Sequence, residues 1–172
     1  MRLADKTAII TGAASGFGRE TALRFAEEGA AVVVGDLDEA RGQDVVATIR
    51  GSGGRAELVV GDVATTAGAE ALVASALDAF GGLDILVNNA GIAQGESRTT
   101  WDMTDERWDE VIRVNLRSVF VCSKAAIPIM LERGAGSIVS VASIAAVRPV
   151  GGAAYAAAKG GILSYTRQVS RE

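Results

Sequence analysis

The sequence predicts an α/β fold in which a doubly wound parallel sheet lies between two layers of helices, a three-layer α/β/α arrangement. Short runs that are apolar throughout alternate with longer segments of helical periodicity, which is typical of parallel strands covered on both faces. Glycines stand at or just after the ends of the helical segments, where helices commonly stop. With 172 residues, 49% of them hydrophobic, the chain corresponds to a single domain, residues 1–172.

The expected strands and helices follow one another in alternation. Each strand is a short aliphatic run, and the five runs are residues 7–10, 31–34, 57–60, 84–87 and 137–141. The helices are expected at residues 17–28, 38–50, 67–80, 105–132 and 153–171, and the fourth range holds one helix or two. The first four helices are stopped by Gly29, Gly51, Gly81 and Gly134.

The last helix is still in progress at Glu172, with no glycine or other C-terminal cap. The strand at 137–141 is then expected to form a bare apolar edge of the sheet. We therefore expect the sequence to be the front part of a longer chain, truncated at its C-terminus, with C-terminal strands missing from it.

The composition excludes several function classes. The chain has 21 acidic and 17 basic residues, a net charge of −4 and no prominent basic run, so nucleic acid and anionic membrane are poor candidates as partners. It has no histidine, which excludes Ser-His-Asp catalysis and histidine-bound zinc, and no metal site is expected. Its single cysteine, Cys122, excludes an intrachain disulfide and is expected to pack in the core. Because no signal-peptide pattern and no apolar run of about 18 residues is present, we expect a cytoplasmic protein.

A glycine-rich loop follows the first strand and opens the first helix. Its glycines, Gly12, Gly16 and Gly18, permit the turn, a close approach of the backbone to a pyrophosphate and close packing of the helix. The helix N-terminus then offers free N–H groups to phosphate. The loop indicates a dinucleotide site, although an ordinary glycine turn between strand and helix would have the same spacing.

Asp36 ends the second strand, where a carboxylate can accept hydrogen bonds from both hydroxyls of an adenosine ribose. The same carboxylate would repel the 2′-phosphate of NADP, and Leu37 stands where a phosphate-binding arginine could sit. NAD is therefore the expected cofactor, and NADP is the less favoured one. The competing interpretation is that Asp36 is a helix N-terminal acid beside Asp38, the actual cap.

Tyr155 and Lys159 are four residues apart in the last helix, so they lie on one face. An ammonium beside a phenol favours the phenolate, which makes the pair an acid/base at neutral pH. With the dinucleotide loop, this pair indicates hydride transfer to or from a carbonyl. The alternative is a half-buried tyrosine and a solvated lysine on an alanine-rich helix.

Taken in order, these motifs resemble the short-chain dehydrogenase/reductase family over nearly the whole sequence, and they imply its Rossmann-type fold. The loop fits the family's Thr-Gly-x-x-x-Gly-x-Gly form, and residues 88–91 fit its Asn-Asn-Ala-Gly segment. Asp62 and Val63 match the family's adenine contact. The residues expected to bind the dinucleotide are Gly12, Ser15, Gly16, Phe17, Gly18, Asp36, Leu37, Asp62, Val63, Asn89, Ala90, Gly91, Tyr155 and Lys159.

The resemblance also implies a catalytic tetrad. Tyr155 would be the general acid or base, and Ser143 would hydrogen-bond the substrate oxygen. Lys159 would favour the phenolate and hold the nicotinamide ribose. Asn115 would hold a water in a proton relay by perturbing its helix. The competing interpretation of Asn115 is a helix-surface amide.

The spacing around Ser143 departs from the family pattern. Ser143 precedes Tyr155 by 12 residues, where the family usually has one more, and the usual offset falls on Ala142. Counted forward from the fifth strand, however, Ser143 takes the place of the catalytic serine. We interpret this as a one-residue deletion in the loop 144–152. Ser140 is the alternative, but in the strand it would be a buried sheet residue.

The leading functional hypothesis is an NAD-dependent oxidoreductase that interconverts a secondary alcohol and a ketone. The alternatives are a 3-oxoacyl thioester reductase using NADPH, a non-catalytic dinucleotide-binding module and a methyltransferase on a similar sheet. Neither of the last two needs the Tyr155–Lys159 pair. A homodimer or homotetramer is expected, because residues 108–131 are apolar around most of the helix circumference and the last helix is rich in small residues.

Overall fold

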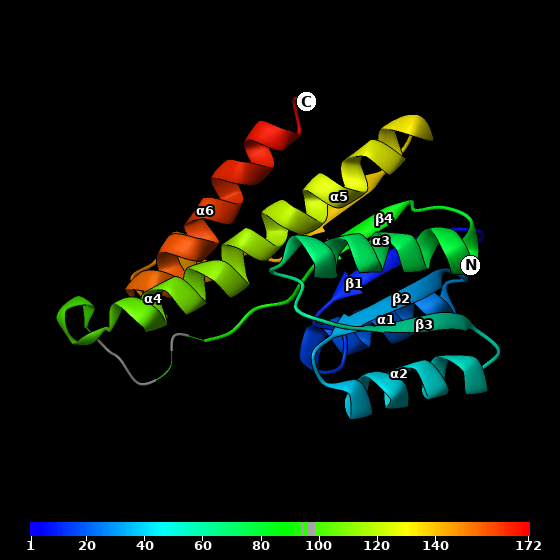
Figure 1. Cartoon of the computed structure of the whole chain (residues 1–172), viewed down its shortest axis with the longest axis horizontal. Coiled ribbons are helices and arrows are strands. Elements are labelled where there is room, and N and C mark those ends of the chain that lie inside the picture. The colour runs from blue at the N-terminus through cyan, green and yellow to red at the C-terminus, as the bar shows by residue number, and fades with distance from the viewer. Residues whose placement is uncertain (94, 96–98) are drawn as a thin grey trace.

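A parallel sheet of five strands forms the centre of the computed structural model, which describes residues 1–93, 95 and 99–172 (Figure 1). The strands lie in the order β3-β2-β1-β4-β5. Their bounds are β1 (Thr7–Thr11), β2 (Ala31–Asp36), β3 (Arg55–Val60), β4 (Ile85–Asn88) and β5 (Ser137–Ser140). The chain reverses its direction across the sheet between β3 and β4. In such sheets, ligands bind at the carboxyl ends of the strands beside this reversal.

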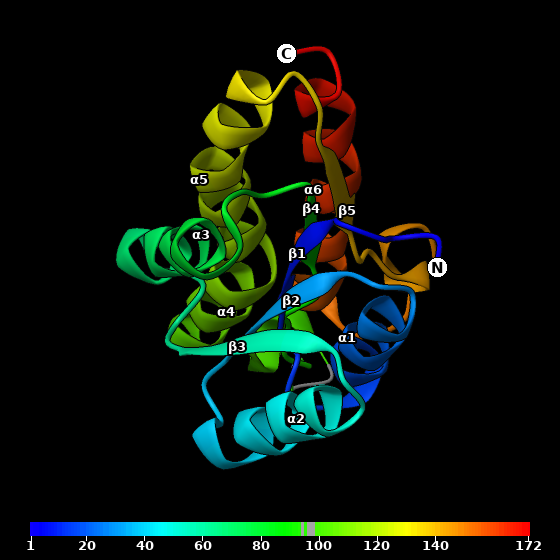
Figure 2. The same cartoon turned by 90° about the vertical axis from the view of Figure 1, so that its right-hand side faces the viewer.

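Helices cover both faces of the sheet. Their bounds are α1 (Gly16–Glu27), α2 (Glu39–Gly51), α3 (Thr66–Phe80), α4 (Asp105–Ile112), α5 (Ser118–Glu132) and α6 (Ala153–Val169). Figure 2 shows α3 and α5 on one side of the strands and α1 on the other. The helix α6 packs against α4. The expected α/β/α fold class is confirmed.

The core follows from the alternation of side chains along each strand. Ile9 belongs to the hydrophobic cluster under α3 and α5, with Leu72, whereas Ile10 belongs to the cluster under α1 and α2, with Val45. Both isoleucines are fully buried. Because β1 is covered on both faces, it has no polar face, as the apolar run in the sequence predicted.

The predicted strands and helices are confirmed, with bounds that differ by one or two residues. Side chains outside the helices set two of the starting points. Asp38 caps α2, its Oδ1 accepting a hydrogen bond from Arg41 N at 3.0 Å. Thr65 caps α3, its Oγ1 accepting from Gly68 N at 3.0 Å. Each cap satisfies an N–H that has no partner within the helix.

The range 105–132, expected to hold one helix or two, is continuous and contains a π-helical turn at Arg113–Arg117 between α4 and α5. By length and composition alone, the stretch Asp105–Glu132 is long and apolar enough to cross a membrane. The sequence did not indicate this, because the stretch contains no uninterrupted apolar run of about 18 residues. In its most apolar window, 44% of the residues are buried inside the protein. The stretch contacts α3, α6 and β4, so it serves here as a core helix of the domain.

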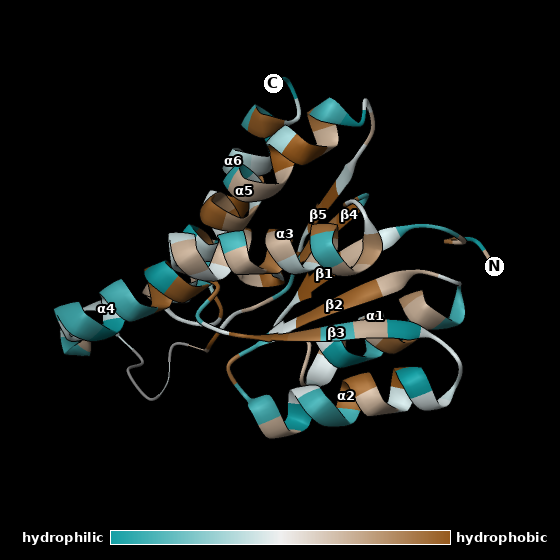
Figure 3. Cartoon of the chain, turned by 45° about the vertical axis from the view of Figure 1, so that its right-hand side comes forward, coloured by the Kyte–Doolittle hydropathy of each residue, from teal (hydrophilic) through white to brown (hydrophobic). Residues whose placement is uncertain are grey.

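β5 lies at the edge of the sheet and, within the described residues, pairs with β4 alone. Val139 is 49% exposed there, as expected for a bare apolar edge. A cavity of about 540 Å³ lies between this strand and the C-terminal halves of α5 and α6. Figure 3 shows hydrophobic residues along β2 and on α5, whereas α4 is mostly hydrophilic.

Candidate active site

The glycine-rich loop connects β1 to α1, and its backbone is packed so closely that side chains are excluded. A Cβ at Gly18 would lie 2.1 Å from the carbonyl oxygen of Gly12. Gly12 has φ +66°, and a Cβ there would lie 2.8 Å from Ala90 Cα. Asn89 fixes the turn, because its Nδ2 donates to Thr11 O at 3.0 Å and to Gly12 O at 3.1 Å. The sequence motif therefore has a steric cause in the approach of the loop to the residues after β4.

The same loop leaves an open side at the start of α1. Gly16 has φ +52°, and in the part of the chain that the structure describes no atom lies within 4 Å of the position that its Cβ would take. The N-cap residue Ser15 makes no side-chain hydrogen bond to the helix, so the first N–H groups of α1 keep their capacity for a ligand. An open cradle with a helix N-terminus fits a pyrophosphate group.

Asp36 lies at the carboxyl end of β2 and supports the glycine-rich loop. Its Oδ2 accepts from Ala14 N at 2.8 Å and its Oδ1 accepts from Asp38 N at 3.0 Å. Asp38 is the residue that caps α2, as the competing interpretation expected, and Asp36 lines the crevice. Leu37 beside it is 70% exposed. A carboxylate with two bonds made has acceptor capacity left for ribose hydroxyls.

Asp36 and Leu37 line a cavity of about 440 Å³, here called the loop cavity. It collects most of the residues expected to bind a dinucleotide. They are Gly12, Ser15, Phe17, Asp36, Leu37, Asp62, Val63, Asn89, Ala90 and Gly91. Of the remaining expected residues, Gly16 and Gly18 shape the loop, and Tyr155 and Lys159 lie in a second cavity.

Asp62, at the end of the loop cavity beside β3, is held by two donors. Its Oδ1 accepts from Ala64 N at 2.9 Å, and its Oδ2 accepts from the guanidinium of Arg113 on the π-helical turn. Burial favours the neutral carboxyl, but these hydrogen bonds and the positive charge of Arg113 outweigh it and lower the pKa of Asp62. Asp62 therefore presents a fixed negative charge to the cavity.

The second cavity, of about 510 Å³, is here called the tyrosine cavity. The expected tetrad, Asn115, Ser143, Tyr155 and Lys159, lines it. Its other lining residues include Phe17, Asn89, Gly91 and Ile92, which also line the loop cavity. The two cavities therefore adjoin, and a ligand long enough to fill both would bring one end to the tetrad.

Lys159 is 4% exposed, and its Nζ donates to Val141 O at 2.8 Å, one residue beyond β5. Its Nζ lies 5.7 Å from the centre of the Tyr155 ring. Burial lowers the pKa of the Lys159 ammonium from the ordinary 10.5. This arrangement overturns the alternative of a solvated lysine: the side chain is buried beside the tyrosine.

Asn115 is fully buried in the middle of the π-helical turn, so it is not a helix-surface amide. Its Nδ2 donates to Ile92 O at 3.0 Å and to Val111 O at 2.9 Å. Among the described residues, its Oδ1 has no hydrogen-bond partner. A Cβ at Gly91 would lie 2.6 Å from this oxygen and 3.6 Å from Lys159 Nζ, so glycine leaves room beside both groups. An orphaned buried acceptor beside a cavity fits a bound water.

The structure places Ser143, rather than Ser140, at the tyrosine cavity. Ser143 caps the 3-10 turn Ile144–Ala146, and its Oγ accepts from Ala145 N at 3.2 Å. Ala142 also lines the cavity but has no hydroxyl. Ser140 ends β5 and accepts from Asn88 Nδ2 at 3.3 Å, outside the residues that line the tyrosine cavity. The shortened loop therefore still brings a serine hydroxyl to the site.

The arginines of the π-helical turn were not expected from the sequence. Arg113 binds Asp62, and Arg117 Nε donates to Ala64 O at 3.2 Å. Their spacing of four residues places both on one helix face. Nothing in the sequence showed that this face meets the loop after β3. Cys122 is buried as expected, and burial raises the pKa of its thiol to about 12.

The parallel sheet and the glycine-rich loop belong to the dinucleotide-binding α/β class of folds. A family model described as short chain dehydrogenase matches residues 6–172, and the chain belongs to this short-chain dehydrogenase/reductase family. It is 40% identical over 172 residues to the (2S)-[(R)-hydroxy(phenyl)methyl]succinyl-CoA dehydrogenase subunit BbsD of Thauera aromatica, covering 100% of this chain and 68% of that protein. It is 37% identical over 173 residues to the 3-oxoacyl-[acyl-carrier-protein] reductase FabG of Thermotoga maritima, covering 100% and 70%.

Among solved structures, a short chain dehydrogenase from Mycobacterium avium matches with a TM-score of 0.89 and 36% identity, covering 96% of this chain and 64% of that one. A putative short-chain dehydrogenase/reductase from Burkholderia xenovorans matches with a TM-score of 0.91 and 35% identity, covering 98% and 69%. The chain thus spans about two thirds of the length of these relatives.

Proposed function

We propose that the protein interconverts a secondary alcohol and a ketone by hydride transfer with NAD(H), with Tyr155 as the general acid/base. One observation carries this proposal. Asn115, Ser143, Tyr155 and Lys159 line one cavity, and this cavity adjoins the crevice formed by the glycine-rich loop. A non-catalytic dinucleotide-binding module would have no need for a buried lysine beside a tyrosine at that position.

The nicotinamide ring, when bound, supplies or accepts the hydride. Ser143 Oγ donates a hydrogen bond to the substrate oxygen and orients it. Tyr155 gives its proton to that oxygen during reduction and takes a proton from the alcohol during oxidation. The Lys159 ammonium stabilises the phenolate that remains after proton donation. A water held by Asn115 Oδ1 would connect Lys159 to the relay that returns the proton.

NAD is favoured over NADP by the charge at the end of β2. Two unit charges about 4 Å apart repel by about 4 kcal/mol at an effective dielectric of 20, and exposure to solvent reduces this value. Asp36 is anchored by Ala14 N and Asp38 N, so it cannot move away from a 2′-phosphate without breaking these bonds. Leu37 offers no positive charge in compensation.

A 3-oxoacyl thioester reductase using NADPH is the second candidate. It is favoured by the similarity to FabG, and the Thauera relative is also named for a CoA thioester. Asp36 argues against the NADPH part of this assignment. A panel of secondary alcohols and 3-hydroxyacyl thioesters, followed at the absorbance of reduced nicotinamide with NAD⁺ and NADP⁺, separates the two. Absence of turnover across the panel, with NAD⁺ bound, would favour the non-catalytic module.

The assembly we propose is a homodimer formed by the continuous helix Asp105–Glu132, here called the long helix, and α6 of each copy, and the proposed location is the cytoplasm. Phe120 and Leu131 on α5 are 44% and 68% exposed, respectively, although both are large and apolar. On α6, Gly161 packs against Leu116 of the same chain, whereas Gly160 has no atom closer than 3.9 Å to the position of its Cβ. Light scattering at micromolar concentration should give at least the dimer mass, and a monomer would contradict this assembly.

A further inference from the structure

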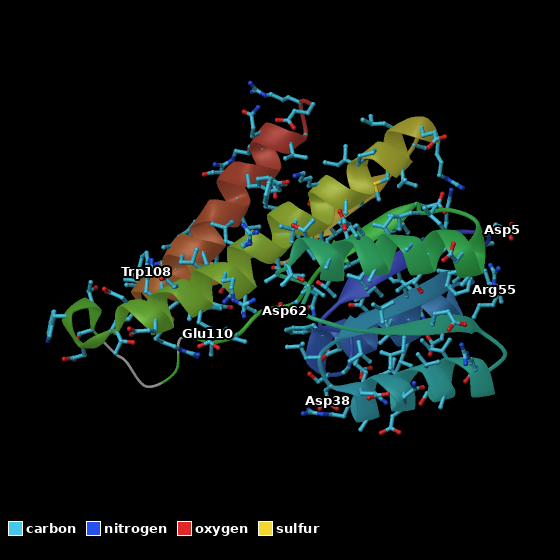
Figure 4. All side chains as sticks on the ribbon, viewed as in Figure 1. Asp5, Asp38, Arg55, Asp62, Trp108 and Glu110 are labelled. Atoms are coloured by element: carbon cyan, nitrogen blue, oxygen red, sulfur yellow. The ribbon has the colours of Figure 1, made fainter. Side chains whose placement is uncertain are left out.

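The loop after β3 is bound by the long helix at three consecutive residues. Arg113 pairs with the Asp62 carboxylate, Cys122 Sγ lies 3.4 Å from Val63 O, and Arg117 Nε donates to Ala64 O at 3.2 Å. We call Arg113, Arg117 and Cys122, with residues 62–64, the three-point clamp. Figure 4 shows Asp62 between the sheet and the long helix, with Glu110 on that helix.

The clamp connects the two cavities. Asp62 and Val63 line the loop cavity, and Arg113 lines it as well. Arg113 and Arg117 are the first and last residues of the π-helical turn, and Asn115 lies between them at the tyrosine cavity. A π-helical turn is rare and is frequently found at functional sites. Side-chain contacts at both ends of the turn therefore limit how Asn115 can shift.

The Arg113–Asp62 pair is a poor stabiliser by itself, because its side chains are 42% and 34% exposed and half-exposed ion pairs contribute little to folding stability. Its position suggests that the pair instead orients the Asp62 carboxylate. With one oxygen held by Arg113 and the other by Ala64 N, the carboxylate is fixed in direction and still has acceptor capacity for a ligand.

We propose that Arg113 and Arg117 are positioning residues that join the loop 62–64 and the π-helical turn into one unit, so that a ligand at the Asp62 end of the loop cavity also restrains the turn that carries Asn115. This inference rests on the proposed dinucleotide site. It predicts that an adenine nucleotide stabilises the clamp, whereas the nicotinamide half of the cofactor, which does not reach residues 62–64, leaves it unchanged.

Cys122 provides a built-in reporter of the clamp. It is the single cysteine of the 172 residues, it is 2% exposed, and its thiol has a raised pKa of about 12, so a thiol reagent reacts with it only after local opening. We would measure the rate of labelling by a disulfide reagent at pH 8, alone and with AMP, nicotinamide mononucleotide or NAD⁺. Each ligand would be present at ten times its own dissociation constant, determined by calorimetry.

In the wild-type protein, AMP and NAD⁺ should slow the labelling about tenfold, because a ligand that binds only the closed form reduces opening by one plus its ratio of concentration to dissociation constant. Nicotinamide mononucleotide should leave the rate unchanged. Equal protection by AMP and by nicotinamide mononucleotide would mean that labelling proceeds through global unfolding. No protection by AMP would mean that a ligand in the loop cavity does not stabilise the clamp. Either result would overturn the proposal.

Arg113→Met should speed the basal labelling and weaken AMP binding about threefold to tenfold, and Arg113→Lys should restore part of both. The matched control is Arg50→Met, which removes an ion pair with Glu57 whose side chains are 52% and 43% exposed, away from both cavities. This variant should change neither quantity. If Arg113→Met behaves like Arg50→Met, the proposal is wrong.

If neither AMP nor NAD⁺ binds the wild type, the proposed function itself fails, whereas NAD⁺ binding without protection of Cys122 refutes only the clamp.

Discussion

The loop cavity and the tyrosine cavity are constructed in different ways. The loop cavity is lined by the turn after β1 and the segment after β4, which the parallel pairing of these strands brings within contact distance, and by residues at the ends of β2 and β3 and on the long helix. The tyrosine cavity is lined by the start of α1, the segment after β4, the long helix, the turn after β5 and α6, and the four tetrad side chains all lie there. Changes in the first region should therefore act through steric fit and binding, and changes in the second through chemistry.

The largest effect is expected from Tyr155→Phe. Loss of the hydroxyl should reduce turnover by about 10²–10⁴, the usual contribution of a positioned acid or base, while NAD⁺ binding stays nearly unchanged. Tyr165→Phe is the matched control, since it lies on the same helix and its hydroxyl is hydrogen-bonded with Ser123. Rates at saturating alcohol and calorimetric dissociation constants separate the two effects. A Tyr155→Phe rate above roughly a tenth of wild type would contradict the assigned mechanism.

Gly18→Ala should break the loop cavity and leave the tyrosine cavity formed. Its Cβ would meet backbone, 2.1 Å from Gly12 O, and overpacking of this kind costs about 1–3 kcal/mol because the loop must shift. Urea unfolding should show this loss, together with weaker NAD⁺ binding. Gly51→Ala, at the end of α2 with no atom within 4 Å of its Cβ position, is the control and should lose neither. Equal behaviour of the two variants would refute the steric explanation.

Cofactor choice tests the charge of the loop cavity alone. The wild type should bind NAD⁺ at least about tenfold more tightly than NADP⁺. The free energy of this preference is smaller than the unscreened repulsion between Asp36 and a 2′-phosphate, because solvent screens the two charges. Asp36→Ser should reduce the ratio of the NADP⁺ dissociation constant to the NAD⁺ dissociation constant, mainly by improving NADP⁺ binding. Calorimetry with both cofactors measures this ratio. Equal or tighter binding of NADP⁺ by the wild type would be incompatible with the proposed role of Asp36.

The smallest effect concerns acid stability at Asp62. Its pKa is lowered from 3.8 in the folded protein, so the ionised carboxylate contributes stability above pH 3.8 that is lost as the pH falls through the folded value. Asp62→Asn should therefore narrow the difference in unfolding free energy between neutral pH and pH 3, by less than about 1 kcal/mol for so exposed a pair. Urea titrations at several pH values measure this difference. Parallel pH profiles of wild type and variant would show that Asp62 does not contribute.

The sequence alone determined the class of fold and most of the expected binding and catalytic residues that line the two cavities. Apolar runs and glycine stops predicted five parallel strands and their helices, because buried strands and helix ends follow local rules of hydrophobicity and backbone geometry. Asp36, Asn89 and the Tyr155–Lys159 pair could be named because each lies at a fixed distance from a recognisable element. The family assignment made from these motifs is confirmed.

The tertiary structure alone decided which groups meet. The sequence favoured Ser143 over Ser140, but whether the Ser143 hydroxyl reaches the cavity lined by Tyr155 and Lys159 depended on the path of the chain after β5. The long helix packs against a loop some fifty residues earlier in the chain. This packing decided the contacts of Arg113 and Arg117 with residues 62–64 and the π-helical turn at Asn115. No local sequence pattern predicts such a contact, because the free energy that stabilises it comes from segments that only the folded chain brings together.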